Sequence, residues 1–251
     1  MRGIYYFAVM TLYSLFRRRT VWGVAILTAL ALAGIASIPA YGLSGGGRFT
    51  VDTGLTSIEI GSLVLAIALA SGIFPRDRET RIAFPILAAP LSRTQYLLGR
   101  YMGTALVQTG FIAVWGAGLV AIIALKGYPM PSDMAGALLL LGVEGCFLLA
   151  VVFFFSFWTS PPLNAPLTIL LFILSQMSVR DFTGLMPGAE GLMRILRLLL
   201  PHMDSFHIKD PVAHGFDVSP VYILLAALYG LAYTAFMLSL ARSVLLSRDL
   251  R

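Results

Sequence analysis

The position in the sequence best suited to do chemistry is a single carboxylate, Glu144, in the middle of the otherwise apolar run over 134–158. A run of this length can cross a bilayer, and an ionised carboxylate near the bilayer centre is costly unless it is paired. Glu144 is therefore expected to face protein or water. Two roles stay open: a substrate-contact or proton-handling carboxylate, or a helix-packing residue satisfied by Gln108 or Gln176. The apolar runs carry no Lys or Arg at comparable depth, which favours packing.

A second group of polar side chains lies in the stretch before the last apolar run. It comprises His202, Asp204, His207, Asp210 and His214. Imidazole nitrogens and carboxylate oxygens are ligands for zinc or copper, but spacing within a loop does not show converging geometry. We therefore predict a solvated polar loop without a metal, in which His202, Asp204 and His207 are the candidate ligands if one binds.

Several catalytic signatures are absent from the sequence. The run Ser44-Gly45-Gly46-Gly47 is not followed by Lys-Ser or Lys-Thr, so it is interpreted as a flexible turn and not as a phosphate loop. No Walker-type loop, Gly-x-Ser-x-Gly elbow or His-Glu-x-x-His helix occurs anywhere. The chain is expected to have no catalytic residues and no cofactor of its own, and any nucleotide hydrolysis must come from a partner.

Composition places the chain in a membrane. Apolar residues make up 58% of the 251 residues and charged residues only 12%, which is too little to cover a water-soluble surface. The net charge of +6 comes from arginines at the ends of apolar runs, where they set topology, so nucleic-acid binding is not expected. The single cysteine, Cys146, excludes an intrachain disulfide and a cysteine metal cluster.

The apolar runs predict an all-α integral membrane protein with one domain over 1–251. Six membrane spans are expected near 22–43, 57–74, 96–125, 134–158, 163–179 and 219–246. Residues 1–20 carry apolar positions at roughly helical spacing and end in Arg17-Arg18-Arg19, which predicts an amphipathic interfacial helix. The alternative is that this segment extends the first span inward.

The distribution of basic residues gives this topology an orientation. Twelve of the 18 Lys and Arg residues fall on one side: Arg2, Arg17, Arg18, Arg19, Arg76, Arg78, Arg81, Arg93, Arg100, Arg242, Arg248 and Arg251. The positive-inside rule then predicts that both termini are cytoplasmic.

Two connections are expected to hold short helices at the membrane surface. The cytoplasmic one, 75–95, continues from its charges into an apolar set typical of a surface helix. The outer one, 180–218, contains an apolar stretch over 192–200 that is too short to span, so it should be interfacial or re-entrant. Small residues along the third span are interpreted as packing or dimer contacts: Gly99, Gly103, Gly110, Gly116 and Gly118.

The cytoplasmic connection also carries a recognisable order of residues. Arg76-Asp77-Arg78-Glu79 is followed by Pro90-Leu91-Ser92-Arg93 and then by Tyr96-Leu97-Leu98-Gly99-Arg100. This order resembles the coupling segment of type-2 ABC transporter permeases, where an acidic residue precedes Gly-Thr, a Leu-rich turn, Pro-Val-Ser-Arg and a Tyr-Leu-x-Gly-Lys-like start of the third span. Arg81-Ile82 stand where Gly-Thr is usual, and Pro85 interrupts the helix. The N-terminal helix and large last outer loop resemble the branch that includes permeases for copper-enzyme maturation.

The resemblance implies the membrane subunit of an ATP-driven exporter in a bacterial or archaeal inner membrane. A separate ATP-binding-cassette subunit would hold ATP and Mg, and a second permease copy or a related permease would complete the translocation path. The contact with the ATPase would be formed by Arg76, Asp77, Arg78, Glu79, Pro90, Ser92 and Arg93. The alternative is an ATP-independent secondary transporter or channel that uses Glu144. No residue selects a substrate.

Overall fold

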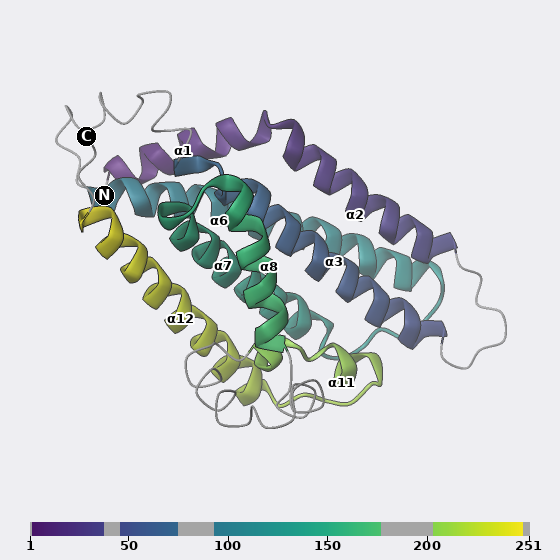
Figure 1. Cartoon of the computed structure of the whole chain (residues 1–251). Helices are drawn as coiled ribbons and strands as arrows, with labels where there is room; N and C mark the ends of the chain where they lie inside the picture. The colour runs from purple at the N-terminus through teal and green to yellow at the C-terminus, as the bar shows by residue number, and fades with distance from the viewer. Residues whose placement is uncertain (1, 38–45, 75–92, 177–202, 248–251) are drawn as a thin grey trace, which may run out of the picture.

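The computed structural model describes residues 2–37, 46–74, 93–176 and 203–247, and within these ranges the chain is helical without strands. The elements are α1 (Arg2–Phe16), α2 (Arg19–Ser37), α3 (Gly46–Ala70), α6 (Arg93–Leu125), α7 (Met134–Trp158), α8 (Pro161–Gln176), the 3-10 helix η1 (Met203–Phe206), α11 (Lys209–Ala213) and α12 (Pro220–Ser247). They form a bundle of long helices (Figure 1).

Five of these helices, α2, α3, α6, α7 and α12, are long and apolar enough to cross a membrane. This confirms the multi-pass, all-helical membrane architecture. The bounds of α7 coincide with the predicted span, because helix-breaking prolines lie on both sides of a strongly apolar run. The remaining expected span, the fifth in order over 163–179, corresponds to α8, whose 16 residues are about 24 Å long, shorter than a hydrocarbon core of about 30 Å.

The first helix is separated from the first span by a break at Arg17 and Arg18. Its buried face, formed by Phe7, Thr11 and Leu15, packs on the start of α6. Tyr5 and Tyr13 are exposed on the other side of α1, and such aromatic side chains are enriched at membrane interfaces. The separate helix agrees with the predicted segment boundary and differs from the alternative of one continuous span.

The second long helix begins earlier than the sequence pattern indicated. The span was expected from residue 57, but α3 starts at Gly46 and already includes Gly47 of the glycine run. The interpretation of this run as a flexible turn was therefore wrong for Gly46 and Gly47, which belong to α3. The polar residues over 48–59 looked like a loop, yet several lie inside the protein, where Thr50 is buried and its hydroxyl donates to the Gly46 carbonyl.

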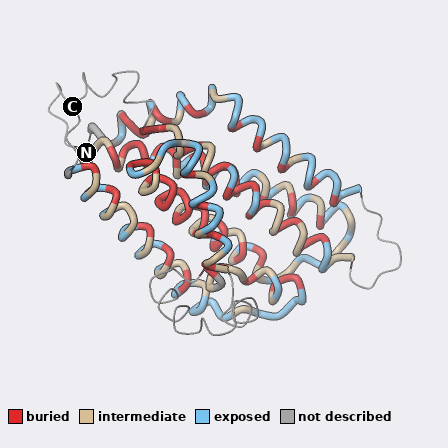
Figure 2. Tube along the Cα trace, viewed as in Figure 1, coloured by how far each residue is buried: buried red, intermediate tan, exposed pale blue. Residues whose placement is uncertain are grey.

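The central helix is α7, which contacts α3, α6, α8 and α12. Figure 2 shows buried positions concentrated on the inner helices and exposed positions along the outer sides of α2 and α12. Those outer sides are apolar: Leu27 and Leu30 are exposed on α2, and Leu224 and Leu228 on α12. In a bilayer such faces meet lipid, so burial inside the bundle depends on packing and not on hydrophobicity alone.

In sequence, α8 connects two helices that run parallel to each other, α7 and α12. The starts of α7 and α12 lie together, since the Asp133 carboxylate accepts a hydrogen bond from the Val218 amide at 2.6 Å. The chain must therefore return between Trp158 and Pro220. The segment that runs back is α8: Asn164 near its start donates to the Val152 carbonyl, and its last residue reaches the middle of α3 (Figure 1).

The glycines of α6 do not all serve close packing. A Cβ at Gly103 would lie 2.7 Å from the Ala8 carbonyl oxygen, and one at Gly116 would lie 2.7 Å from Leu138. These two positions let α1 and α7 approach α6 closely, as predicted. Around Gly110 and Gly118 nothing lies within 4 Å, so these glycines contact no other described helix.

Parts of two predicted features lie outside the described residues. Arg76, Asp77, Arg78, Glu79, Pro90 and Ser92 of the expected ATPase contact all fall within 75–92, and the expected short outer helix over 192–200 falls within 177–202. Arg93 is described. It begins α6, and its Nη1 donates to the Leu245 carbonyl at 3.2 Å, which joins the start of α6 to the end of α12.

Candidate functional site

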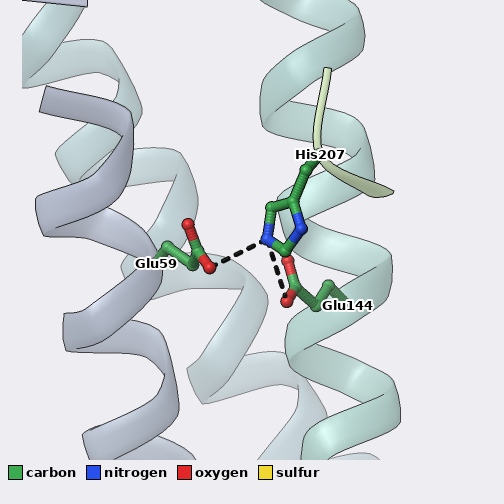
Figure 3. Close-up of side chains that lie close together, drawn as sticks. All are labelled: Glu59, Glu144 and His207. Atoms are coloured by element: carbon green, nitrogen blue, oxygen red, sulfur yellow. Dashed lines mark hydrogen bonds and ion pairs between the residues drawn. The ribbon is translucent and has the colours of Figure 1, made fainter. Parts of the chain in front are cut away.

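Three ionisable side chains from distant parts of the sequence meet inside the bundle. Glu59 comes from α3, Glu144 from α7, and His207 from the two-residue connection between η1 and α11 (Figure 3). The His207 Nε2 atom lies 2.8 Å from Glu59 Oε1 and 3.6 Å from Glu144 Oε1. One imidazole nitrogen therefore faces both carboxylates. We call Glu59, Glu144 and His207 the carboxylate–histidine cluster.

Glu59 has a full set of hydrogen-bond donors. Its Oε1 accepts from Gln176 Nε2 at 2.9 Å as well as from the His207 ring, and its Oε2 accepts from Lys209 Nζ at 2.8 Å. Glu59 is only 4% exposed, so these contacts compensate a carboxylate that has lost its water. Lys209 also reaches the Thr56 hydroxyl one turn away on α3, at 3.4 Å.

Glu144 is in a different situation. It is 1% exposed, and neither of its oxygens has a hydrogen-bond partner among the described residues. The amides expected to satisfy it bond elsewhere: Gln108 Nε2 donates to the Ser62 carbonyl and hydroxyl, and Gln176 donates to Glu59. The prediction that Glu144 faces the protein interior is confirmed, whereas the predicted partners Gln108 and Gln176 were wrong.

A short segment of the outer connection carries His207 and Lys209 into the bundle. Met203, Phe206 and Val212 are almost completely buried, and η1 contacts α7, α8 and α12. The Phe206 ring lies 6.1 Å from that of Tyr229 on α12, and the Tyr222 hydroxyl donates to the backbone of the segment. These apolar anchors place the polar side chains of the same segment against α3 and α7.

The cluster lies deep in the membrane-spanning part of the protein. Glu144 is ten residues into α7, which corresponds to about 15 Å along the helix, near the middle of a core about 30 Å thick. His207 reaches this depth from a segment that is not itself a span. Ionisable groups at such depth are rare in membrane proteins and mark substrate, ion or proton pathways by default.

The charges within this region are close to balance. Two carboxylates face Lys209 and, when it is protonated, His207. Burial alone would lower the pKa of His207, but the hydrogen bond to Glu59 and the negative charges of Glu144 and Glu59 outweigh it and raise this pKa above its ordinary value. This direction favours the protonated imidazole, which would be the second positive charge beside Lys209.

Neither the protein-family models nor the curated proteins give a match to this chain. The contacts of the carboxylate–histidine cluster allow it to hold a proton or a cation between Glu59 Oε1, Glu144 Oε1 and His207 Nε2.

Of the three predicted candidate metal ligands, the structure brings one into the cluster. His207 is in the cluster, His202 lies outside the described residues, and Asp204 belongs to η1. Glu59, a member of the cluster, and its neighbour Lys209 were not predicted. Glu59 could have been found, because it is a carboxylate within the apolar run that ends at Phe74, the same signal that identified Glu144. No periodicity in the sequence indicates that the Lys209 side chain contacts Glu59 of α3.

Proposed function

We propose that the chain is the membrane-spanning permease subunit of an ATP-binding-cassette exporter, driven by ATP hydrolysed on a separate subunit. The observation that carries the proposal is the spacing of Glu79, Pro90 and Arg93, which resembles the coupling segment of type-2 permeases and leads directly into the long helix α6. The five membrane-length helices are compatible with it, and the sequence has no nucleotide site of its own.

The arrangement around the start of α6 supports a force-receiving role for this end of the molecule. At 33 residues α6 is about 50 Å long and exceeds the hydrocarbon core by about 20 Å, so part of it extends past the membrane. At its start Arg100 Nη1 donates to the Thr11 hydroxyl of α1, and Arg93 binds the last turn of α12. A push on residues before Arg93 would therefore reach α1, α6 and α12 together.

The distribution of charge supports the orientation. Arg17, Arg18 and Arg19 lie at the junction of α1 and α2, in the half of the bundle that also holds Arg93 and the final turns of α12 (Figure 1). We propose that this end is cytoplasmic, that α8 is a sixth, short span, and that both termini face the cytoplasm of a bacterial or archaeal cell. Reporter fusions after residues 17, 126 and 247 test this: only the fusion at 126 should report the outer side.

The coupling proposal is tested by co-purification. The tagged chain, isolated in mild detergent from its native membrane, should bring down a soluble subunit with Walker motifs in a near-stoichiometric amount, identified by mass spectrometry. The pair Glu79→Lys and Arg93→Glu should abolish that association while the permease still elutes as a single folded species. Arg48→Glu is the matched control, since Arg48 begins α3 at the opposite end and should leave the association intact.

The proposal fails if no ATPase is recovered, or if transport in vesicles persists without one. The second candidate, a secondary transporter that uses Glu144, is favoured by the buried carboxylate–histidine cluster. Transport that needs an ion gradient, is lost in Glu144→Gln and is indifferent to ATP would establish that candidate instead. Dependence on ATP hydrolysis would exclude it.

A further inference from the structure

We propose that the carboxylate–histidine cluster is a binding site for one divalent transition-metal ion of the zinc class, with Glu59, Glu144 and His207 as ligands. One ligand atom from each residue lies within 4.8 Å of the other two. Metal–ligand bonds of about 2.0–2.2 Å place the ligand atoms of a tetrahedral site roughly 3.4 Å apart, so the side chains would have to rearrange around the ion, and His207 Nε2 and Glu59 Oε1 would move apart from 2.8 Å. This inference goes beyond the proposed transport function, because zinc binding is a property of this chain alone and needs neither an ATPase nor transport.

The cluster without an ion is incomplete at one residue. The Glu144 carboxylate is 99% buried, is directed at the cluster in Figure 3, and lacks a hydrogen bond to any described residue. The His207 ring lies 3.6 Å away, beyond hydrogen-bond reach. A buried carboxylate in this position is normally paired, hydrogen-bonded or bound to a metal. A cation between the three ligand atoms would meet that requirement for Glu144.

The donor set selects the class of ion. Magnesium and calcium take oxygen ligands, whereas one imidazole nitrogen with two carboxylate oxygens suits zinc and related first-row divalent ions. Copper(I) and other soft ions prefer sulfur, and the three ligands here contain none. Three protein ligands leave at least one coordination position open, unlike a structural zinc site, in which protein ligands fill all four positions.

The neighbouring polar groups are compatible with a bound ion. Lys209 and Gln176 both contact Glu59, at Oε2 and Oε1 respectively, each at 2.8–2.9 Å. The lone pair of Oε1 that faces His207 would become available to the ion once His207 Nε2 gives up its proton, and Lys209 on Oε2 would keep Glu59 monodentate. Such outer contacts orient first-shell ligands and tune affinity. His207 would bind through Nε2 in its neutral form.

The experiment measures zinc on the purified full chain in lipid nanodiscs. After equilibrium dialysis against Zn²⁺ with excess Mg²⁺, metal analysis should give one zinc per chain, and Co²⁺ should give an absorption spectrum of a low-symmetry nitrogen–oxygen site. Glu144→Gln and His207→Gln should each weaken zinc binding at least 100-fold. His214→Ala is the control, because His214 is an exposed histidine of the same segment that stacks on Phe216 and should leave zinc binding unchanged.

Three results would overturn the site: no stoichiometric zinc on the wild-type chain, zinc retained by both ligand variants, or equal loss in the His214→Ala control. If Glu144→Gln does not yield folded protein, His207→Gln and the cobalt spectrum decide. Because no ATPase is present in this measurement, its failure leaves the exporter proposal untouched, and the failure of co-purification would leave the metal site untouched.

Discussion

The same substitution should destabilise the protein strongly at one buried carboxylate, Glu59, and hardly at all at the other, Glu144. Glu59→Gln removes a charge that accepts hydrogen bonds from three side chains, and it leaves Lys209 and His207 without their closest counter-ion. Breaking a buried ion pair from one side costs about 3–5 kcal/mol. At about 2–4 °C per kcal/mol for a chain of this size, Tm should fall by about 6–20 °C.

Glu144→Gln removes a charge that has no hydrogen bond. The attraction lost is that to the His207 ring at 3.6 Å, about 4–5 kcal/mol at an effective dielectric constant of about 20. The desolvation penalty relieved is also several kcal/mol for a buried carboxylate. The two nearly cancel, so we expect Tm to change by no more than about 4 °C, as for a shift of about 1 kcal/mol.

The assay is thermal unfolding of both variants in the same detergent, followed by intrinsic fluorescence, with a chelator present to keep metal ions out of the comparison. Size-exclusion profiles before heating serve as the folding control. If Glu144→Gln loses as much Tm as Glu59→Gln, the two carboxylates share one network and the contrast drawn from their hydrogen bonds is wrong. An unchanged Tm in Glu59→Gln would equally refute it.

Three further changes test the packing. Gly103→Ala should lower stability by about 1–3 kcal/mol, because the new methyl group meets the backbone of α1, whereas Gly110→Ala should be silent; thermal unfolding compares the pair. Tyr101→Phe should cost about 1 kcal/mol through the lost 2.9 Å bond to a carbonyl of α7, measured in the same way. Asp133→Ala frees the Val218 amide and should speed hydrogen exchange at the start of α12, with no change at the far end of the helix.

The membrane-spanning helices could largely be predicted from the sequence, because their signal is local. The span over 134–158 was placed to the residue, since an apolar run without competing polar positions leaves one solution. The start of α3 was missed because Arg48, Thr50 and Asp52 make its first turns look polar. Polarity there is tolerated where a side chain such as Thr50 is buried and donates to the carbonyl of its own helix.

The contacts of the cluster could not be predicted, because they depend on chain reversal. The sequence indicated that Glu144 lies deep and faces inward, and it is 1% exposed. Its neighbour His207 is 63 residues further along the chain, beyond α8 and the outer connection, and no repeat or spacing links the two. Gln108 was a reasonable partner by depth, but the Ser62 backbone competes for its amide.

The insertion of residues 203–213 between the helices has a consequence for biogenesis. Translation runs from the N-terminus, so α3 and α7 leave the ribosome before His207 and Lys209 are made. During that interval Glu59 and Glu144 are in the nascent bundle without their cationic neighbours, the costliest state of an intramembrane carboxylate. Docking of the segment therefore follows the synthesis of α3 and α7, and it is completed only with α12, because Phe206 packs on Tyr229. A chain released before residue 203 would contain α3 and α7 with both buried carboxylates. It would lack His207 and Lys209, the basic side chains that offset the cost of these carboxylates in the membrane.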